Sequence, residues 1–254
     1  MSNINLVLIL LAGGIGRRIN KKISKQMIRY NNLTILEMNI INFNKQLENI
    51  PIQIVTNDND FVEVSKICSK YKLLSPVLGG DERHKSTYKG LKSIEHINPK
   101  YVLIHDTARP FVSPKVTKEL LTYTKQEIFC VAPVIKISDS IREILKNKIT
   151  KSIEKKNKFL VQTPQLCNYE ILKKIIKNSK KKFEDETAVF LHNSMEVIAI
   201  NGDPLSLKIT YDKDLNLLEP HLTKNHNNYV TKIGNGFDIH RFDNSKYSKN
   251  NFIL

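Results

Sequence analysis

In the first part of the chain, continuous apolar runs alternate with a segment in which apolar residues have helical spacing. Residues 5–12 form a nearly continuous apolar run that ends at Gly13 and Gly14, which is typical of a strand buried on both faces of a parallel sheet. Residues 34–47 instead carry apolar side chains at close to helical spacing, and residues 51–56 form a second strand-like run. Strand, helix and strand in this order are the signature of a βαβ unit.

The same patterns continue along the chain. They predict helices over residues 60–71, 86–94, 169–178, 186–192 and 214–222, and strands over residues 73–78, 101–105, 128–134 and 196–200. A lysine-rich stretch within residues 141–158 is typical of a hairpin or arm rather than of core. We therefore expect an α/β fold with a mostly parallel, twisted sheet and helices on both faces.

The chain is strongly basic, which raises the question of an anionic partner. Its 40 lysines and arginines exceed its 25 acidic residues and give a net charge of +15, so small phosphates and nucleic acid are both candidates. Much of the excess lies in residues 146–158 and 173–182, where few aromatic residues are available to stack on bases. A solvated lysine-rich surface is therefore favoured over a nucleic-acid-binding stripe.

Cysteine usage and hydropathy indicate the compartment. Cys68, Cys130 and Cys167 are far apart and form no CxxC pair, which argues against a disulfide framework or a cysteine-rich zinc module. The longest apolar run, residues 6–12, is far shorter than the roughly 20 residues of a membrane span, and no basic region precedes it as in a secretory signal. We expect a cytoplasmic protein with no membrane partner.

A glycine-rich segment follows the first predicted strand. Gly13, Gly14 and Gly16 would let backbone N–H groups point into one concavity, and Arg18 and Lys25 would add the positive charge that a polyphosphate requires. The spacing fits neither the GxGxxG fingerprint nor the GxxxxGK[ST] loop. Taken alone, the segment is also compatible with a tight turn that carries surface arginines.

A second candidate segment, residues 104–110, begins at the end of the strand predicted over 101–105. Ligands of open α/β sheets bind outside the carboxyl ends of the strands. Asp106 is placed to hold a metal or a ribose hydroxyl, and Arg109 has the planar fork that clamps a phosphate. An Asp–Arg pair that merely closes a loop is the alternative.

Read in order, these and several weaker segments resemble one enzyme family. They are residues 12–18 with Lys25, 80–83, 105–110, 132–134 with Asp139 and Ser140, 163–165, 185–186 and 208–210. Together, over residues 4–222, they resemble the 2-C-methyl-D-erythritol 4-phosphate cytidylyltransferases. The resemblance implies a Rossmann-like nucleotidyltransferase fold with a projecting β-arm, through which the family forms homodimers.

The resemblance also implies the reaction. Such enzymes join CTP to methylerythritol 4-phosphate and release pyrophosphate, by direct in-line attack of the substrate phosphate on the α-phosphorus of CTP, in the non-mevalonate route to isoprenoids. Mg²⁺ accompanies the CTP. Arg18 and Lys25 match the family residues that stabilise the charge on the α-phosphate.

Further site residues follow from the same resemblance. Those that match nucleotide-binding positions are Ala12, Gly13, Gly14, Gly16, Gly80, Asp81, Ser86, Asp106 and Lys208. Those that match substrate-binding positions are Thr107, Arg109, Ser140 and Lys155.

Three departures from the family pattern concern substrate binding. Ser140 stands where the family usually has threonine, and Lys155 stands where it has an arginine that often acts across a dimer. Lysine keeps the charge but loses the bidentate fork. Residues 135–138 also make the segment before Asp139 longer than usual, so the register is least secure there.

The C-terminal part of the chain has a different character. We expect a cytidylyltransferase domain over residues 1–222, a polar linker over 223–230, and the incomplete start of a second domain over 231–254. Residues 232–242 resemble the opening of 2-C-methyl-D-erythritol 2,4-cyclodiphosphate synthases, in which the aspartate and histidine that match Asp238 and His240 bind a divalent metal, normally zinc. A catalytic zinc site needs three protein ligands, so we expect this one to be incomplete within the chain.

Two alternative functions stay open. The first is a cytidylyltransferase that acts on another polyol phosphate, such as ribitol 5-phosphate. The resemblance of residues 232–242 to a methylerythritol-pathway enzyme argues against that acceptor. A basic nucleic-acid-binding protein would instead bind polynucleotide with a steep salt dependence.

Overall fold

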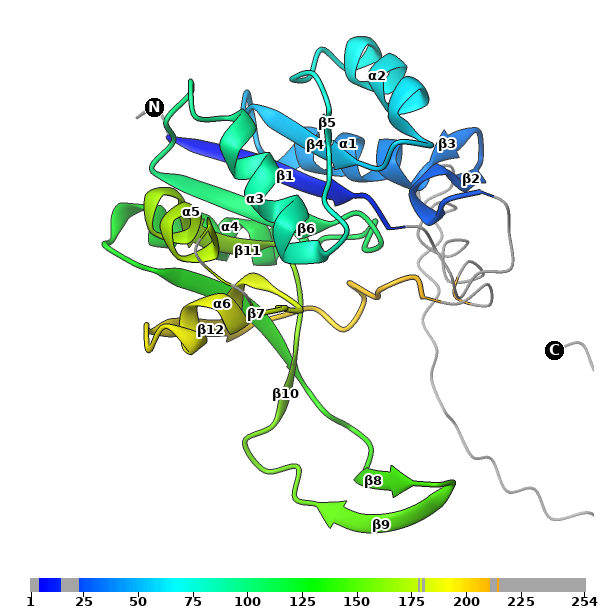
Figure 1. Ribbon diagram of the computed structural model, residues 1–254, viewed down its shortest axis with the longest axis vertical. Helices are drawn as coiled ribbons and strands as arrows, with labels where there is room; N and C mark the ends of the chain where they lie inside the picture. Colours follow the sequence, from blue (N-terminus) through cyan, green and yellow to red (C-terminus); the bar gives the residue numbers. More distant parts are fainter. Residues whose placement is uncertain (1–4, 15–22, 178, 180, 211–213, 215–254) are drawn as a thin grey trace, which may run out of the picture. The chain divides into compact units, whose positions relative to one another are not determined.

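The computed structural model describes residues 5–14, 23–177, 179, 181–210 and 214. Its centre is a twisted sheet, visible in Figure 1, in which the strand order is β10-β7-β11-β6-β1-β4-β5 and β12 also pairs with β7. These strands are β1 (Leu6–Ala12), β4 (Ile52–Thr56), β5 (Val77–Leu78), β6 (Tyr101–Asp106), β7 (Cys130–Lys136), β10 (Phe159–Val161), β11 (Gln165–Asn168) and β12 (Val197–Asn201).

Parallel and antiparallel pairings divide the sheet into two parts. β1, β4, β5 and β6 are parallel neighbours, and β12 runs parallel to β7. β11 is antiparallel to both β6 and β7, and β10 is antiparallel to β7. The α/β fold with a mainly parallel sheet is therefore confirmed, with an antiparallel strand inserted at β11.

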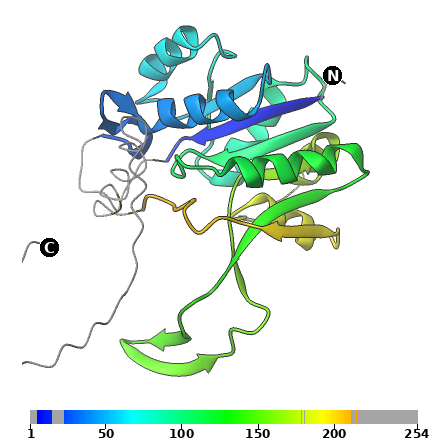
Figure 2. The same cartoon turned by 180° about the vertical axis from the view of Figure 1, so that it is seen from behind.

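Helices cover both faces of the sheet, as Figures 1 and 2 show from opposite sides. One face packs against α1 (Ile35–Gln46), α2 (Phe61–Lys70) and α4 (Pro114–Thr122), and the other against α3 (Arg83–Ser93), α5 (Tyr169–Lys177) and α6 (Glu186–His192). In β1, Leu8 and Leu10 belong to the first core and Val7 and Ile9 to the second. A strand buried on both faces explains why its sequence is apolar without interruption.

Local signals define the helix starts. Thr34 and Glu37 form a capping box at α1, in which each side chain accepts a hydrogen bond from the other residue's backbone N–H. The Asp185 carboxylate accepts a hydrogen bond from the Ala188 N–H at the start of α6. Both caps fix the entry of a helix onto the sheet.

An arm projects from the sheet (Figures 1 and 2). It consists of β8 (Ile141–Leu145) and β9 (Lys148–Ile153), which pair with each other and with no strand of the main sheet. Smaller elements are the pair β2 (Arg29–Tyr30) and β3 (Leu33–Thr34), and the 3-10 turns η1 (Lys25–Met27) and η2 (Tyr123–Lys125). The hairpin predicted within residues 141–158 is confirmed.

Several predicted boundaries were wrong. The strand predicted over residues 73–78 is only β5, because just Val77 and Leu78 pair with β4. Helix α3 begins three residues earlier than predicted, and α4 and β11 were not predicted as elements. The predicted helix over 214–222, the linker and the second domain lie outside the described residues, save for Asp214. Within the described part, no helix has the length and apolar character to cross a membrane.

Candidate active site

The carboxyl ends of the central parallel strands meet at one edge of the sheet. Register places Leu11 of β1 beside Asp106 of β6, and Ala12 beside Thr56 of β4. Thr107 continues the pairing, because its N–H and its hydroxyl both donate hydrogen bonds to the Leu11 carbonyl, at 3.2 and 2.9 Å. Gly13 directly follows this point. The predicted glycine segment and the predicted Asp106 segment therefore begin side by side.

Asp106 lies between two cations from distant segments. Lys208 Nζ donates to its Oδ2 at 2.7 Å, and Arg83 Nε donates to its Oδ1 at 3.1 Å. Arg83 also grips Glu186 in a bidentate pair, with N–O distances of 2.7 and 2.9 Å. Thr87 donates a further hydrogen bond to Glu186. Strand β6, helices α3 and α6, and the segment that carries Lys208 are thus tied together through charged side chains.

These groups are held in their charged forms. Burial acts against the charge of Arg83, but Glu186 and Asp106 outweigh it and raise the pKa of Arg83 above its ordinary value. Burial likewise acts against the charge of Asp106, and the Arg83 and Lys208 charges hold its pKa well below the ordinary range. The cluster therefore keeps an ionised carboxylate at the strand end.

A neutral histidine supports the loop that follows β6. His105 is fully buried, and this burial lowers its pKa to about 4. Its Nε2 lies 3.0 Å from the Asn39 Oδ1 and 2.9 Å from the Arg109 carbonyl, so we assign the ring proton to Nε2. Nδ1 then accepts from the Thr163 hydroxyl at 3.0 Å, and that oxygen accepts from the Asp106 N–H. The chain of bonds fixes the backbone on both sides of Asp106.

A second glycine loop lies next to this edge. The Gly79 N–H donates to the Thr56 carbonyl at 2.7 Å, and the Gly80 N–H donates to the Ser86 Oγ at 3.0 Å. A Cβ at Gly80 would lie 2.5 Å from the Lys85 Cβ, so no side chain fits there without movement. Loop and helix α3 are therefore closely packed at this point.

The segment after β12, residues 202–210, carries further site residues to the same edge, and we call it the strap. It is the orange trace that leaves β12 in Figure 1. The Ile209 N–H donates to the Ala108 carbonyl at 2.8 Å, and Lys25 Nζ donates to the Thr210 carbonyl at 2.9 Å. Arg109 donates to the Ser206 carbonyl at 2.7 Å. The strap thus brings Lys25, Arg109 and Lys208 together.

Comparison with known proteins identifies the family of the chain. Residues 6–224 match the family model of 2-C-methyl-D-erythritol 4-phosphate cytidylyltransferase. The chain belongs to this family. The match covers the whole of the described sheet and its helices.

Curated relatives include single and two-part proteins. A Clostridium botulinum protein named 2-C-methyl-D-erythritol 4-phosphate cytidylyltransferase is 35% identical over 225 residues, covering 85% of this chain and 96% of the relative. A Wolbachia pipientis protein named bifunctional enzyme IspD/IspF is 30% identical over 254 residues, covering 96% of this chain and 62% of the relative. The chain thus spans about 60% of the bifunctional relatives' length.

The fold agrees with these matches. The solved structure of the bifunctional IspDF from Campylobacter jejuni superposes with a TM-score of 0.71 at 24% identity, covering 84% of this chain and 53% of that one. At this identity the likeness concerns the fold. The cytidylyltransferase fold expected from the sequence is therefore confirmed.

The expected site residues of this cytidylyltransferase-family chain are only partly gathered at the edge. Ala12, Gly13, Gly80, Ser86, Asp106, Thr107, Arg109, Lys25 and Lys208 lie at or next to it by the contacts given above, and Gly14 follows Gly13. Asp81 adjoins the Gly80 loop, but its largely exposed carboxylate pairs with Lys85 at 2.9 Å. Gly16, Arg18, Asp238 and His240 lie outside the described residues.

Two expected substrate residues lie at the root of the arm. Ser140 is exposed, and Lys155 donates to the carbonyl of Ser138 at 2.7 Å. Within the described residues, neither shares a hydrogen bond or ion pair with the Asp106 cluster. Their role in binding the substrate stays a prediction.

Sequence reasoning assigned no role to Arg83 and Glu186, although both stand in segments that carry the family resemblance. The signal available was local: Arg83 follows the Gly80 loop, and Glu186 follows the helix-capping Asp185. Their pairing joins residues 103 positions apart. No spacing rule finds such a contact.

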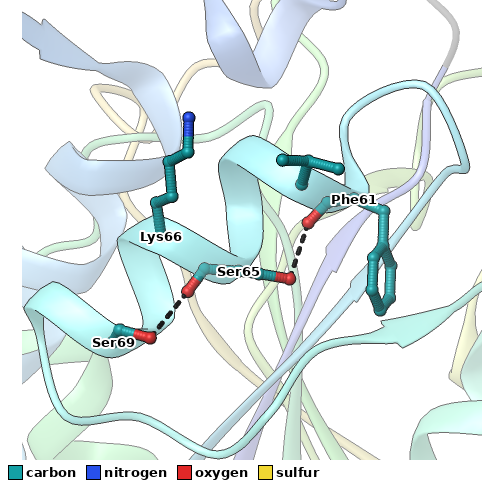
Figure 3. A pocket seen from close by; sticks show the side chains of 5 residues that line it. Phe61, Ser65, Lys66 and Ser69 are labelled. Carbon is teal, nitrogen blue, oxygen red and sulfur yellow. Dashed lines mark hydrogen bonds between the residues drawn. The ribbon is translucent and has the colours of Figure 1, made fainter.

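A surface hollow on α2 lies apart from these residues (Figure 3). It is lined by Phe61, Val62, Ser65, Lys66 and Ser69. The Ser65 hydroxyl donates to the Phe61 carbonyl and the Ser69 hydroxyl to the Ser65 carbonyl, as the dashed lines show. Both hydroxyls are used by their own helix, so the hollow offers little chemistry.

Proposed function

We propose that this chain transfers the cytidylyl group of CTP to 2-C-methyl-D-erythritol 4-phosphate and releases pyrophosphate. The observation that carries the proposal is the convergence of Lys25, Arg109 and Lys208 on the strand edge beside Asp106, in a chain of this family. The alignments with two relatives named as this transferase cover 96% and 97% of the length of those relatives.

The chemistry requires two anions to approach each other. An oxygen of the substrate phosphate forms a bond to the α-phosphorus of CTP, the bond from that phosphorus to the bridging oxygen breaks, and pyrophosphate leaves. Lys25 and Arg18 stabilise the charge that builds on the α-phosphate, and Lys208 supports the triphosphate. Lys25 and Lys208 each bond to an oxygen in the structure, which holds their charges at the edge.

The backbone of the two glycine loops binds the nucleotide. Gly13, Gly14 and Gly16 follow β1, and Gly80 and Asp81 present the pyrimidine-reading loop that Ser86 ties to α3. Thr107, Arg109, Ser140 and Lys155 face the methylerythritol phosphate. Among the described residues, no group forms a hydrogen bond with the buried Nε of Arg109, so this side chain suits a phosphate.

A divalent metal fits this site in one way. Within the described residues no three acidic, histidine or cysteine side chains converge as a metal cage, and Asp106 supplies one carboxylate. Mg²⁺ with a nucleotide is usually held by one or two carboxylates and by the phosphates themselves, which fits Asp106. When bound, the metal neutralises triphosphate charge.

The whole protein is proposed to be a cytoplasmic homodimer with a second activity. The arm exposes Ile144, Leu145 and Ile149, which suits contact with a second copy. Bifunctional relatives align over 96% of this chain, which supports residues 231–254 as the start of a cyclodiphosphate synthase domain with Asp238 and His240 as zinc ligands.

Pyrophosphate release from CTP and Mg²⁺ tests the proposal, with methylerythritol 4-phosphate and ribitol 5-phosphate as parallel acceptors. We expect release only with methylerythritol phosphate, and a loss of about 10²–10³ in kcat for Lys25→Ala. Lys118→Ala, which removes an exposed lysine of α4, is the matched control. Release with ribitol phosphate instead would assign the other acceptor.

A polynucleotide titration tests the alternative of nucleic-acid binding. Tight binding with a log–log salt slope of about −0.9 per neutralised phosphate, together with no release from either acceptor, would favour that function. We expect weak binding, because the cations of the edge are engaged with Asp106 and with strap carbonyls.

A further inference from the structure

The strap is anchored by one buried amide, that of Gln162. Its Nε2 donates to the carbonyls of Asp203 and Ser206, at 2.9 and 3.4 Å, and its Oε1 accepts from the Asp203 N–H at 3.1 Å. The side chain is 3% exposed. The amide thus satisfies three backbone groups of the strap, which have no sheet or helix to pair with.

Gln162 is itself held rigidly. It follows β10, its N–H donates to the Pro133 carbonyl at 2.8 Å, and its carbonyl accepts from the Gln165 Nε2 at 3.2 Å. At the start of the strap, a Cβ at Gly202 would lie 2.4 Å from the Gln162 Oε1 and 3.1 Å from the Val134 carbonyl. The strap therefore begins in direct contact with a fixed amide.

The Gln162 amide binds the strap two residues before Lys208. The Ser206 carbonyl accepts from both Gln162 and Arg109, and two residues later Lys208 reaches Asp106 at 2.7 Å. Ile209 is buried next, with its N–H on the Ala108 carbonyl. An extended backbone advances only about 3.3 Å per residue, so a shift at Ser206 carries over to Lys208.

We propose that Gln162 is a positioning residue of the transferase reaction, which holds the strap so that Lys208 reaches the Asp106 edge. This rests on the proposed function. The amide is needed in both of its halves. Glutamate would set a carboxylate against two carbonyls, and leucine would remove the acceptor of the Asp203 N–H and one donor from each of the Asp203 and Ser206 carbonyls, which keep the Ser206 N–H and Arg109.

A double-mutant cycle tests whether Gln162 acts through Lys208. In the wild-type protein, we expect Gln162→Leu to lower kcat/KM for CTP about tenfold. In a protein that already carries Lys208→Ala, we expect the same substitution to lower kcat/KM by less than about twofold. Full multiplication of the two effects would overturn the proposal, because a general structural defect does not depend on Lys208. Wild-type activity of Gln162→Leu would overturn it as well.

Gln53→Leu is the matched control. Gln53 is equally buried, and its amide donates to the carbonyls of Ile54 and Ser75, away from the strap. We expect it to lower the Tm by as much as Gln162→Leu while leaving kcat/KM within about twofold of wild type. If Gln162→Leu does not fold, Gly202→Ala displaces the same amide and enters the same cycle.

Hydrogen exchange reads the strap without any substrate. We expect the backbone N–H groups of residues 203 and 205–209 to exchange at least about tenfold faster in Gln162→Leu than in wild type, and at the wild-type rate in Gln53→Leu. Unchanged exchange would overturn the anchor even if activity fell. An inactive wild type with faster exchange in Gln162→Leu would instead leave the anchor standing and remove the proposed function.

Discussion

The carboxyl edge of the sheet and the projecting arm use charge in opposite ways. At the edge, Arg83 and Asp106 form short, largely buried pairs with fixed partners. On the arm, Lys151 and Glu143 are 3.8 Å apart and more than half exposed. Buried charges demand partners, whereas solvated charges do not. The charged side chains of the edge are therefore held in fixed positions by one another, whereas those of the arm are solvated.

Removing Arg83 tests the edge most severely. Counting only partners in the described part of the chain, Arg83→Met would leave Asp106 with one cation and Glu186 with none. We expect the free energy of unfolding to fall by about 3–5 kcal/mol in urea titrations. The control is Arg29→Met, whose exposed pair with Glu63 is 3.5 Å long, and we expect a change within about 1 kcal/mol. Equal losses in the two variants would show that burial does not determine how much an ion pair contributes to the free energy of unfolding.

His105 gives the stability of the edge a dependence on pH. Its pKa falls from 6.5 to about 4 on folding, so between these pH values the unfolded chain binds the proton and the folded chain does not. Stability then decreases as pH falls through this window, and we expect a loss of about 1–3 kcal/mol between pH 7 and pH 4.5.

Urea unfolding at a series of pH values measures this loss. His105→Gln removes the titrating group, so its contribution to the slope disappears, whereas His96→Gln, at an exposed position, keeps the wild-type slope. If His105→Gln kept the full slope, another group would be responsible for it.

The two regions also differ in how far the sequence predicts them. The buried run of β1 and the helical spacing of apolar residues over 34–47 are local signals, and the strand and the helix α1 that they predict are confirmed. β11 has only four residues, and its antiparallel place between β6 and β7 depends on pairing across the chain. Helix α4, which was not predicted, begins at Pro114, a residue type favoured at the first position of a helix.

The site shows the same division. Resemblance singled out Asp106 and Lys208, which lie 2.7 Å apart in the structure although 102 positions separate them. It gave no role to Gln162 or Arg83, whose contacts are with other segments of the fold. Residues that contact a ligand leave a motif in the sequence, whereas their supports are found only through the fold.

Lys155 tests whether the arm contributes to the site. Lys155→Arg restores the fork that the family usually has, and we expect KM for methylerythritol 4-phosphate to fall on the order of threefold with kcat unchanged. Lys148→Arg, on an exposed position of β9, is the matched control and should leave KM unchanged. An unchanged KM in Lys155→Arg would place the residue outside the substrate site.

The apolar tip of the arm gives the smallest expected effect on the fold and the clearest contrast with the edge. Ile144 and Ile149 are register partners on β8 and β9, and each is about 70% exposed. Replacing both by serine removes no core contact, so we expect the free energy of unfolding of the domain to change by less than about 0.5 kcal/mol. If two copies pair through their arms, sedimentation equilibrium will show weaker self-association of the double variant. Unchanged association would move the interface away from the tip, whereas a large loss of stability would mean that the hairpin packs on the sheet, contrary to its separate pairing.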